Sequence, residues 1–116
     1  MSSQDNEGRI DYIEFGAIDL ERTKAFFGDV FGWKFTDYGP DYTSFEDGRL
    51  AGGFRRDNAT PGGPLVVLYS TDLEETQTRV ESAGGTIAKS IFSFPGGRRF
   101  HFRDPNGNEL AVWSDR

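Results

Sequence analysis

The sequence contains no cysteine, only one histidine, and no long apolar run. Without cysteine, the chain forms neither a disulfide nor a thiolate metal site. The N-terminal stretch MSSQDNEGR is polar, so we expect no signal peptide and no membrane span, and we expect a cytoplasmic protein. The net charge of −6 argues against a nucleic-acid partner, because phosphate contacts require clustered basic residues.

Hydrophobic residues are also scarce, at 35% of the 116 residues. A chain of this length is expected to form one domain with one core. Eleven phenylalanines and two tryptophans partly compensate, because each aromatic side chain buries a large area. A core this lean favours a homodimer that buries further apolar surface.

One segment occurs in two versions, DLERTKAFFGDVFG at 19–32 and DLEETQTRVESAGG at 72–85. Each version begins with an aspartate that can cap a helix and ends with a glycine that can adopt a left-handed conformation. The spacing of the less polar residues predicts one buried face in each helix, made of Leu20, Thr23, Phe27, Val30 and Phe31 in the first and of Leu73, Thr76, Val80 and Ala83 in the second. The sequence therefore predicts two helices at equivalent places in a duplicated unit.

Alternating or continuous apolar patterns around these helices predict strands. The first unit, about 10–55, is expected to have strands at 10–18, 33–38, 42–46 and 49–54. The second unit, about 65–113, is expected to have strands at 65–70, 86–90, 98–103 and 109–113, with 92–97 as a flexible loop. Residues 1–8 read as a flexible tail and 56–64 as a linker. The order strand, helix and three strands, occurring twice, predicts one α+β domain of two βαβββ units.

Three stretches, FFGDVFGWKF, the AGGT at 83–86 and the closing FRDPNGNELAVW, resemble the glyoxalase/bleomycin resistance/dioxygenase family, also called the vicinal oxygen chelate superfamily. The resemblance covers nearly the whole chain, about 10–113. It implies a curled eight-stranded mixed sheet with the helices on its convex face and a ligand cavity on its concave face, usually within a dimer. The family includes isomerases, epimerases, dioxygenases, thiol transferases and drug-sequestering proteins, so the resemblance does not select one function.

The resemblance also identifies where catalytic members hold a divalent metal ion. Those positions carry Tyr12, Val66 and Ala111 here, and the strand LAGGF supplies neither histidine nor carboxylate. A metal site needs three or four nitrogen or oxygen donors that converge on one point. The usual metal site is therefore expected to be lost, and we predict no cofactor.

Strand parity predicts which side chains share the concave face, since alternate residues of a strand point to opposite sides. The predicted ligand-binding residues are Tyr12, Glu14, Arg99, His101, Glu109 and Trp113. A mostly apolar wall with a few convergent polar groups is typical of a small-molecule pocket. Trp33 is a further candidate for a wall of the cavity, and Phe94 for a lid.

His101 is the candidate catalytic residue together with Glu14, because an imidazole acts as a base when a carboxylate orients it. Either Glu14 or Glu109 could be that carboxylate. Arg99 could bind an anionic group through its planar guanidinium. Each residue also has a structural interpretation: a lone histidine on a sheet is often only hydrogen-bonded, and the basic cluster at 98–103 can balance surface charge.

Three kinds of function follow from these observations. The favoured one is a binding protein, of the sequestration or resistance type, for a small aromatic or anionic molecule. The alternative is a metal-dependent isomerase, lyase or dioxygenase in which His101, Glu14 and Glu109 hold an ion at displaced positions. The third is a regulatory subunit whose sheet edge or dimer face is the functional surface.

Overall fold

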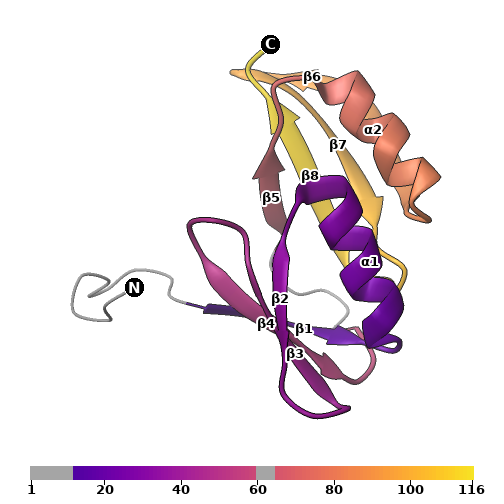
Figure 1. The fold of residues 1–116 in the computed structure, drawn as a ribbon. Helices are drawn as coiled ribbons and strands as arrows, with labels where there is room; N and C mark the ends of the chain where they lie inside the picture. The colour runs from indigo at the N-terminus through magenta and orange to yellow at the C-terminus, as the bar shows by residue number, and fades with distance from the viewer. Residues whose placement is uncertain (1–11, 60–64) are drawn as a thin grey trace.

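The computed structural model describes residues 12–59 and 65–116. The first unit contains β1 (Tyr12–Ala17), α1 (Leu20–Phe31), β2 (Lys34–Asp37), β3 (Tyr42–Glu46) and β4 (Ala51–Arg56) (Figure 1). The second unit contains β5 (Val66–Tyr69), α2 (Leu73–Ser82), β6 (Thr86–Phe94), β7 (Gly97–Arg103) and β8 (Glu109–Ser114). This order confirms the predicted pair of βαβββ units. The predicted tail at 1–8, the start of the first predicted strand and part of the predicted linker lie outside the described residues.

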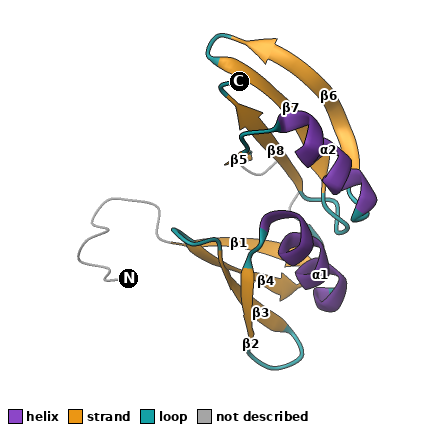
Figure 2. Cartoon of the chain, turned by 45° about the horizontal axis from the view of Figure 1, so that its top comes forward, coloured by secondary structure: helices purple, strands orange, loops and turns teal. Residues whose placement is uncertain are grey.

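The strands form two mixed sheets of four, in the equivalent orders β1-β4-β3-β2 and β5-β8-β7-β6. In each sheet the first strand of the unit pairs parallel with the last, and the other neighbours are antiparallel. The helices α1 and α2 cover one face of these sheets (Figure 2). The α+β class is confirmed. The strand pairs of the described residues stay within each four-stranded sheet, so β1 and β5 are edge strands.

The predicted helix starts are confirmed, and one predicted helix stop is wrong. Asp19 and Asp72 each accept a hydrogen bond from the backbone N–H three residues later. Gly32 ends α1 with a φ of 72°, as expected. In the second unit the left-handed residue is Gly84, with a φ of 101°, and not Gly85. Gly85 serves close packing instead, because a Cβ there would lie 2.7 Å from Val80 Cγ1.

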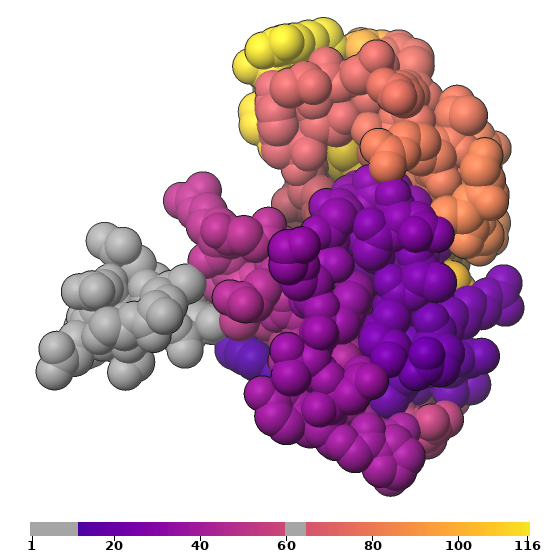
Figure 3. Space-filling view, viewed as in Figure 1, coloured from indigo at the N-terminus to yellow at the C-terminus, as the bar shows by residue number. Residues whose placement is uncertain are grey.

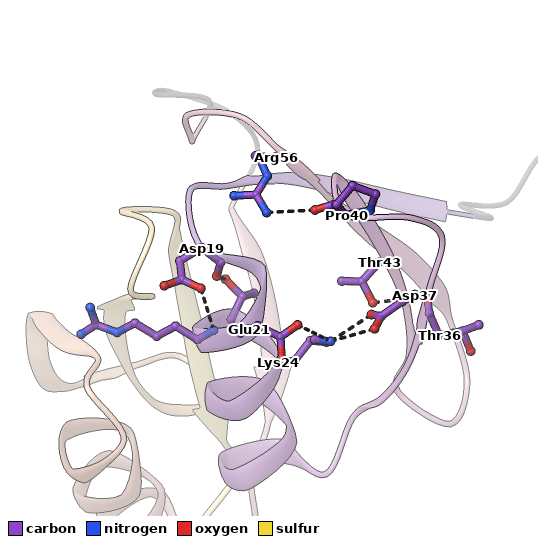
Figure 4. A network of polar contacts seen from close by, with 10 residues as sticks. Asp19, Glu21, Lys24, Thr36, Asp37, Pro40, Thr43 and Arg56 are labelled. Carbon is purple, nitrogen blue, oxygen red and sulfur yellow. Dashed lines mark hydrogen bonds and ion pairs between the residues drawn. The ribbon is translucent and has the colours of Figure 1, made fainter.

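A polar network joins α1 to the neighbouring β2 (Figure 4). Lys24 Nζ lies 2.8 Å from a carboxylate oxygen of Glu21 and 3.0 Å from one of Asp37. The hydrogen bond from Lys24 lowers the pKa of Asp37 below its ordinary value. No helix among the described residues is long and apolar enough to cross a membrane.

The helix α1 contributes to the core of both units. Leu20, Thr23, Phe27 and Val30 are buried as predicted, and Phe26, which the pattern did not include, is buried as well. Consecutive helix residues point about 100° apart, so Phe26 and Phe27 can pack in different directions. Phe27 packs on Phe54 of the first sheet, whereas Phe26 packs on Phe102 of the second, with ring centroids 6.0 Å apart. The result is one continuous core.

The turn between β7 and β8, predicted only as a hairpin signal, also connects the two units. The buried Asp104 accepts hydrogen bonds from the backbone and side chains of Asn106 and Asn108. Asn108 Nδ2 donates to the carbonyl of Gly16 at 2.9 Å, and Asn106 accepts from the N–H of Ile18 at 2.7 Å. These hydrogen bonds connect the second unit to the end of β1.

The flexible loop predicted at 92–97 is wrong, because β6 continues to Phe94 and only Pro95 and Gly96 form the turn. Phe92 and Phe94 pair across the sheet with Arg99 and Gly97 of β7. Their rings pack on the side chains of the neighbouring strands, which stabilises the longer hairpin.

Candidate functional site

The predicted site residues lie on the sheet faces that are turned away from the buried core, in two separate groups. In the second sheet Arg99 pairs with Trp113, and Arg103 pairs with Glu109. The alternate residues of β7 and β8, such as Phe100 and Phe102, are fully buried in the core. Strand alternation therefore places the predicted residues of this sheet on its open face. Tyr12 and Glu14 lie on β1 of the other sheet.

The first group is a closed hydrogen-bond network of Tyr12, Glu14, Tyr42 and Arg55, called the tyrosine network below. The two tyrosine hydroxyls share a hydrogen bond, and Tyr42 donates to Glu14 at 2.9 Å. Arg55 donates to the other oxygen of Glu14 at 3.2 Å. Burial, followed by the hydrogen bonds with Tyr12 and Glu14, raises the pKa of Tyr42. Both hydroxyls and both carboxylate oxygens of this network are therefore already hydrogen-bonded.

Gly53 makes the tyrosine network possible. A Cβ at this position would lie 2.0 Å from the hydroxyl oxygen of Tyr42 and 2.6 Å from that of Tyr12. The two hydroxyls consequently rest directly on the backbone of β4, where only glycine leaves room. Tyr42 and Arg55 were not predicted as members of the site, because their approach to Glu14 depends on the register of β1, β4 and β3.

The second group lies on the open face of the second sheet and is called the arginine–histidine face below; it consists of Phe92, Phe94, Arg99, His101, Glu109 and Trp113. The guanidinium of Arg99 lies 5.2 Å from the ring centroid of Phe92 and 5.4 Å from that of Phe94. Trp113 packs against Phe94 and, edge-on, against Tyr69 of β5. A cation thus lies among aromatic rings, which attract it through their negative faces.

His101 is held by Glu109. Its Nδ1 lies 3.0 Å from Glu109 Oε2, and the histidine is only 4% exposed. Of the two carboxylates that could orient the imidazole, the structure brings Glu109 to it, whereas Glu14 belongs to the tyrosine network. The hydrogen bonds of Glu14 go to Tyr42 and Arg55. The predicted catalytic pair of His101 and Glu14 is therefore not joined by a hydrogen bond.

Two buried nitrogen atoms on the arginine–histidine face have no hydrogen-bond partner. Within residues 12–59 and 65–116, Arg99 Nε and His101 Nε2 are the buried side-chain nitrogen or oxygen atoms without one. Buried polar groups are almost always paired, because an unpaired one loses its hydration without compensation. Both exceptions lie on one strand, two residues apart. This spot is the candidate functional site.

The residues present do not fit a divalent metal ion. At the positions where the resemblance implies ligands, the chain carries Tyr12, Val66 and Ala111. The described part of the chain contains no group of three histidine or carboxylate side chains that could hold an ion. His101 and Glu109 alone are too few donors for such a site.

A hollow of about 430 Å³ lies between the β3–β4 hairpin and β5 and includes Tyr69 in its lining (Figure 3). Most of its lining is apolar and includes Phe15, Trp33, Val66 and Leu68. Trp33 thus lines a hollow, but on the core side, where it stacks on Phe27. The carboxylate of Asp47 is occupied by backbone N–H groups of its own turn.

Sequence reasoning missed Phe92 and Tyr69 as neighbours of the site. Phe94, expected as a lid on a loop, is instead part of a strand beside Arg99 and Trp113. The alternation in IFSF at 91–94 was the available signal for a strand, but the following PGG favoured a loop.

Comparison with known proteins gives one family and many similar folds. A model of the family described as "Glyoxalase/Bleomycin resistance protein/Dioxygenase superfamily" matches residues 9–112. No curated protein matches the sequence. A glyoxalase/bleomycin resistance protein/dioxygenase family enzyme from Burkholderia phytofirmans PsJN is 16% identical, with a TM-score of 0.81 over 92% of this chain and 100% of that chain.

Two other similar structures belong to named proteins. The E126Q mutant of the fosfomycin resistance protein FosX from Listeria monocytogenes, complexed with Mn(II) and 1S,2S-dihydroxypropylphosphonic acid, is 17% identical, with a TM-score of 0.78 over 90% of this chain and 87% of that chain. TioX from Micromonospora sp. ML1 is 21% identical, with a TM-score of 0.71 over 91% and 98% of the two chains. At these identities the likeness shows the fold alone.

Proposed function

This chain belongs to the glyoxalase/bleomycin resistance protein/dioxygenase superfamily, and from that premise we propose that it binds a small aromatic anion on the arginine–histidine face. The observation that carries the proposal is Arg99, whose guanidinium lies close to two phenylalanine rings while its Nε is buried without a partner. The proposed role is sequestration of this molecule.

The charge of Arg99 supports an anionic ligand. Among the described residues Arg99 makes no ion pair, although the chain carries 19 acidic residues. The nearby Glu109 is already engaged by His101 and Arg103. A carboxylate can accept two parallel hydrogen bonds from a guanidinium, which is a strong and directional interaction. A ligand carboxylate would supply the missing partner.

The surroundings of Arg99 support an aromatic ligand. Trp113 lies opposite it across the β7–β8 pair, and Tyr69 extends the same wall, with ring centroids 5.2 Å apart. Tyr69 is 47% exposed, so part of this wall faces outward. Aromatic walls bind planar rings through stacked or edge-on contacts. The FosX structure shows that a protein of this fold can hold a small acid, in that case a phosphonic acid.

Calorimetric titration of the protein with benzoate and with 2-naphthoate tests the proposal. Arg99→Gln is expected to weaken binding at least about tenfold, since a charge-assisted hydrogen bond contributes about 1.5–3 kcal/mol. Arg98→Gln is the matched control, because Arg98 carries the same charge one residue away but pairs with Glu74. Trp113→Ala is expected to abolish binding with the fold intact.

The proposal fails if neither acid binds to the wild-type protein. It also fails if Arg98→Gln and Arg99→Gln weaken binding equally, since binding would then follow net charge. Unchanged affinity in Trp113→Ala would remove the aromatic wall from the site.

We also propose a homodimer. Leu65, Val67 and Tyr69 at the edge strand β5 are 40–47% exposed, and the apolar hollow borders the same strand. An exposed apolar edge strand readily pairs with another chain. Sedimentation velocity is expected to give a dimer, and Val67→Lys is expected to give a monomer. A wild-type monomer at all concentrations would contradict this proposal.

A further inference from the structure

We propose that the aromatic anion also carries a hydroxyl group, which donates a hydrogen bond to Nε2 of His101; this inference rests on the function proposed above. The ligand class is thus a hydroxylated aromatic acid. Arg99 binds its acid group, and His101 selects for its hydroxyl group.

The bond between His101 and Glu109 determines what Nε2 can do. An ionised carboxylate only accepts hydrogen bonds, so the Nδ1 that lies 3.0 Å from Glu109 carries the proton. In the neutral imidazole the other nitrogen, Nε2, is then an acceptor. A ligand atom that meets Nε2 must therefore be a donor, such as a hydroxyl group. A ligand with only acceptors would leave this nitrogen unsatisfied.

The burial of Nε2 makes this selection strict. His101 is 4% exposed, and its Nε2 has no partner among the described residues. In a buried site, a missing hydrogen bond cannot be replaced by water. Sites that hydrogen-bond a ligand hydroxyl therefore discriminate strongly against analogues without it.

The spacing of the two groups fits one aromatic ring. Arg99 and His101 lie two residues apart on β7, so their backbones are about 7 Å apart along the strand. This is close to the length of a benzene ring with a substituent at each end. Phe92 borders both side chains, with its centroid 5.2 Å from the guanidinium and 5.9 Å from the imidazole. The proposal therefore requires the Phe92 side chain to turn aside so that the ligand reaches the buried Nε2.

The register of β6 shifts between Lys89 and Phe92, where the strand faces His101 and Arg99. Such irregularities interrupt the regular hydrogen bonding of a strand and redirect its side chains. Phe92, the ring that the proposal requires to turn aside, is therefore attached next to the irregular part of the hairpin.

The test compares 4-hydroxybenzoate, benzoate and 4-methoxybenzoate by calorimetry on the wild-type protein and on His101→Phe. On the wild type, 4-hydroxybenzoate is expected to bind at least about tenfold more tightly than the other two acids, which cannot donate. His101→Phe is expected to bind all three with similar affinity. Arg99→Gln is expected to weaken all three together.

Nitrogen NMR gives a second measurement that does not depend on a folded variant. His101 is the only histidine of the chain, so its two ring nitrogens give unambiguous signals in imidazole-labelled protein. The Nε2 signal is expected to shift toward the hydrogen-bonded value on addition of 4-hydroxybenzoate and to remain in place with benzoate.

The outcomes separate the two proposals. If benzoate binds in an Arg99-dependent way, but 4-hydroxybenzoate binds no more tightly and leaves the Nε2 signal in place, the inference about the hydroxyl group is overturned and the proposed function stands. If none of the three acids binds, both are overturned.

Discussion

The two βαβββ units share one architecture, but their open faces differ in how their polar groups are satisfied. On the first sheet, the tyrosine network pairs both hydroxyls and both oxygens of Glu14. On the second sheet, Arg99 Nε and His101 Nε2 are buried without partners. A satisfied network stabilises a sheet, whereas buried unpaired groups cost stability and are found at functional sites. The first face is therefore internally satisfied, and the second is the face on which we propose that a ligand binds.

The largest effect is predicted for a substitution that disrupts the packing between the two units. Phe102→Ala removes a fully buried ring that packs on Phe26 and Phe31 of α1, so the free energy of unfolding should fall by about 3–5 kcal/mol. Urea unfolding is followed by the fluorescence of Trp33 and Trp113, one in each unit, measured in separate Trp→Phe backgrounds.

Because the core is continuous, both tryptophans should report the same transition. Two separate transitions in the wild type would show that the units unfold independently. Tyr38→Ala, at an exposed position with no role in the proposed site or dimer, serves as the control and should change stability little.

The second prediction concerns the turn that fastens the units together. Asn108→Ala removes the hydrogen bond to Gly16 and leaves its carbonyl without that donor. We expect a loss of about 1–3 kcal/mol in the free energy of unfolding. Thermal and urea unfolding measure it, with the exposed Asn58→Ala as control. An equal effect in both variants would mean that the turn does not hold the units together.

The third prediction sharpens the comparison of the two open faces. Tyr42→Phe should lower the free energy of unfolding by about 1 kcal/mol, because Tyr42 is hydrogen-bonded to Tyr12 and Glu14. Arg99→Leu replaces the unpaired nitrogen and keeps an apolar side chain against Phe92 and Phe94, so it should leave stability unchanged or raise it, while it removes the proposed ligand binding. Urea unfolding measures the first effect and calorimetry the second. The comparison breaks if Tyr42→Phe impairs binding as strongly as Arg99→Leu.

The fourth prediction concerns a feature that the units share. Asp19→Ala and Asp72→Ala each remove a carboxylate that accepts a backbone N–H at a helix start. Each alanine substitution should lower the free energy of unfolding by about 1 kcal/mol, visible as a lower melting temperature. Asp→Asn at the same positions should retain most of this stability. Unchanged melting temperatures in both alanine variants would refute the capping role.

The smallest effect is expected in acid. The hydrogen bond from Lys24 lowers the pKa of Asp37 from 3.8 in the first unit, and that from Arg98 lowers the pKa of Glu74 from 4.5 in the second. Each ion pair therefore contributes stability above the ordinary pKa, and the contribution is lost as the pH falls through the lower folded-state pKa. In Lys24→Met and Arg98→Met, the melting temperature should fall less steeply toward low pH than it does in the wild type.

Melting curves between about pH 6 and pH 2.5 measure this effect at low and high salt. Both pairs lie at the surface, where salt screens charge, so high salt should remove most of the difference between variants and wild type. If the melting temperature of both variants falls with pH as steeply as that of the wild type, these ion pairs do not contribute to stability.

Much of the fold could be predicted from local patterns. Asp19 and Asp72 identified the helix starts, because capping depends only on the residues of one turn. The left-handed residue after α2 lies one position earlier than predicted. Gly84 and Gly85 are equally able to adopt this conformation, and the packing of Gly85 against Val80 decided between them. The strand β6 was predicted too short, since the rings of Phe92 and Phe94 are held by Arg99 and Trp113 on other strands.

The candidate site was predictable in part. Parity alone placed Arg99, His101, Glu109 and Trp113 on one face of the second sheet, as the register confirms. Which carboxylate meets His101 could not be predicted, because Glu14 and Glu109 both satisfied the parity rule. Only the pairing of β7 with β8 brings Glu109 to the imidazole.

Local sequence patterns specify the two units, their helix starts and the alternation of side chains, because these features depend on interactions within a few residues of the chain. The tertiary structure alone decided how α1 joins the two cores, how Asn108 reaches Gly16, and that the tyrosine network is closed while the nitrogens of Arg99 and His101 stay unpaired. Hydrogen-bond satisfaction is a property of groups that meet in space, and the pairing of strands from distant parts of the chain determines which groups meet.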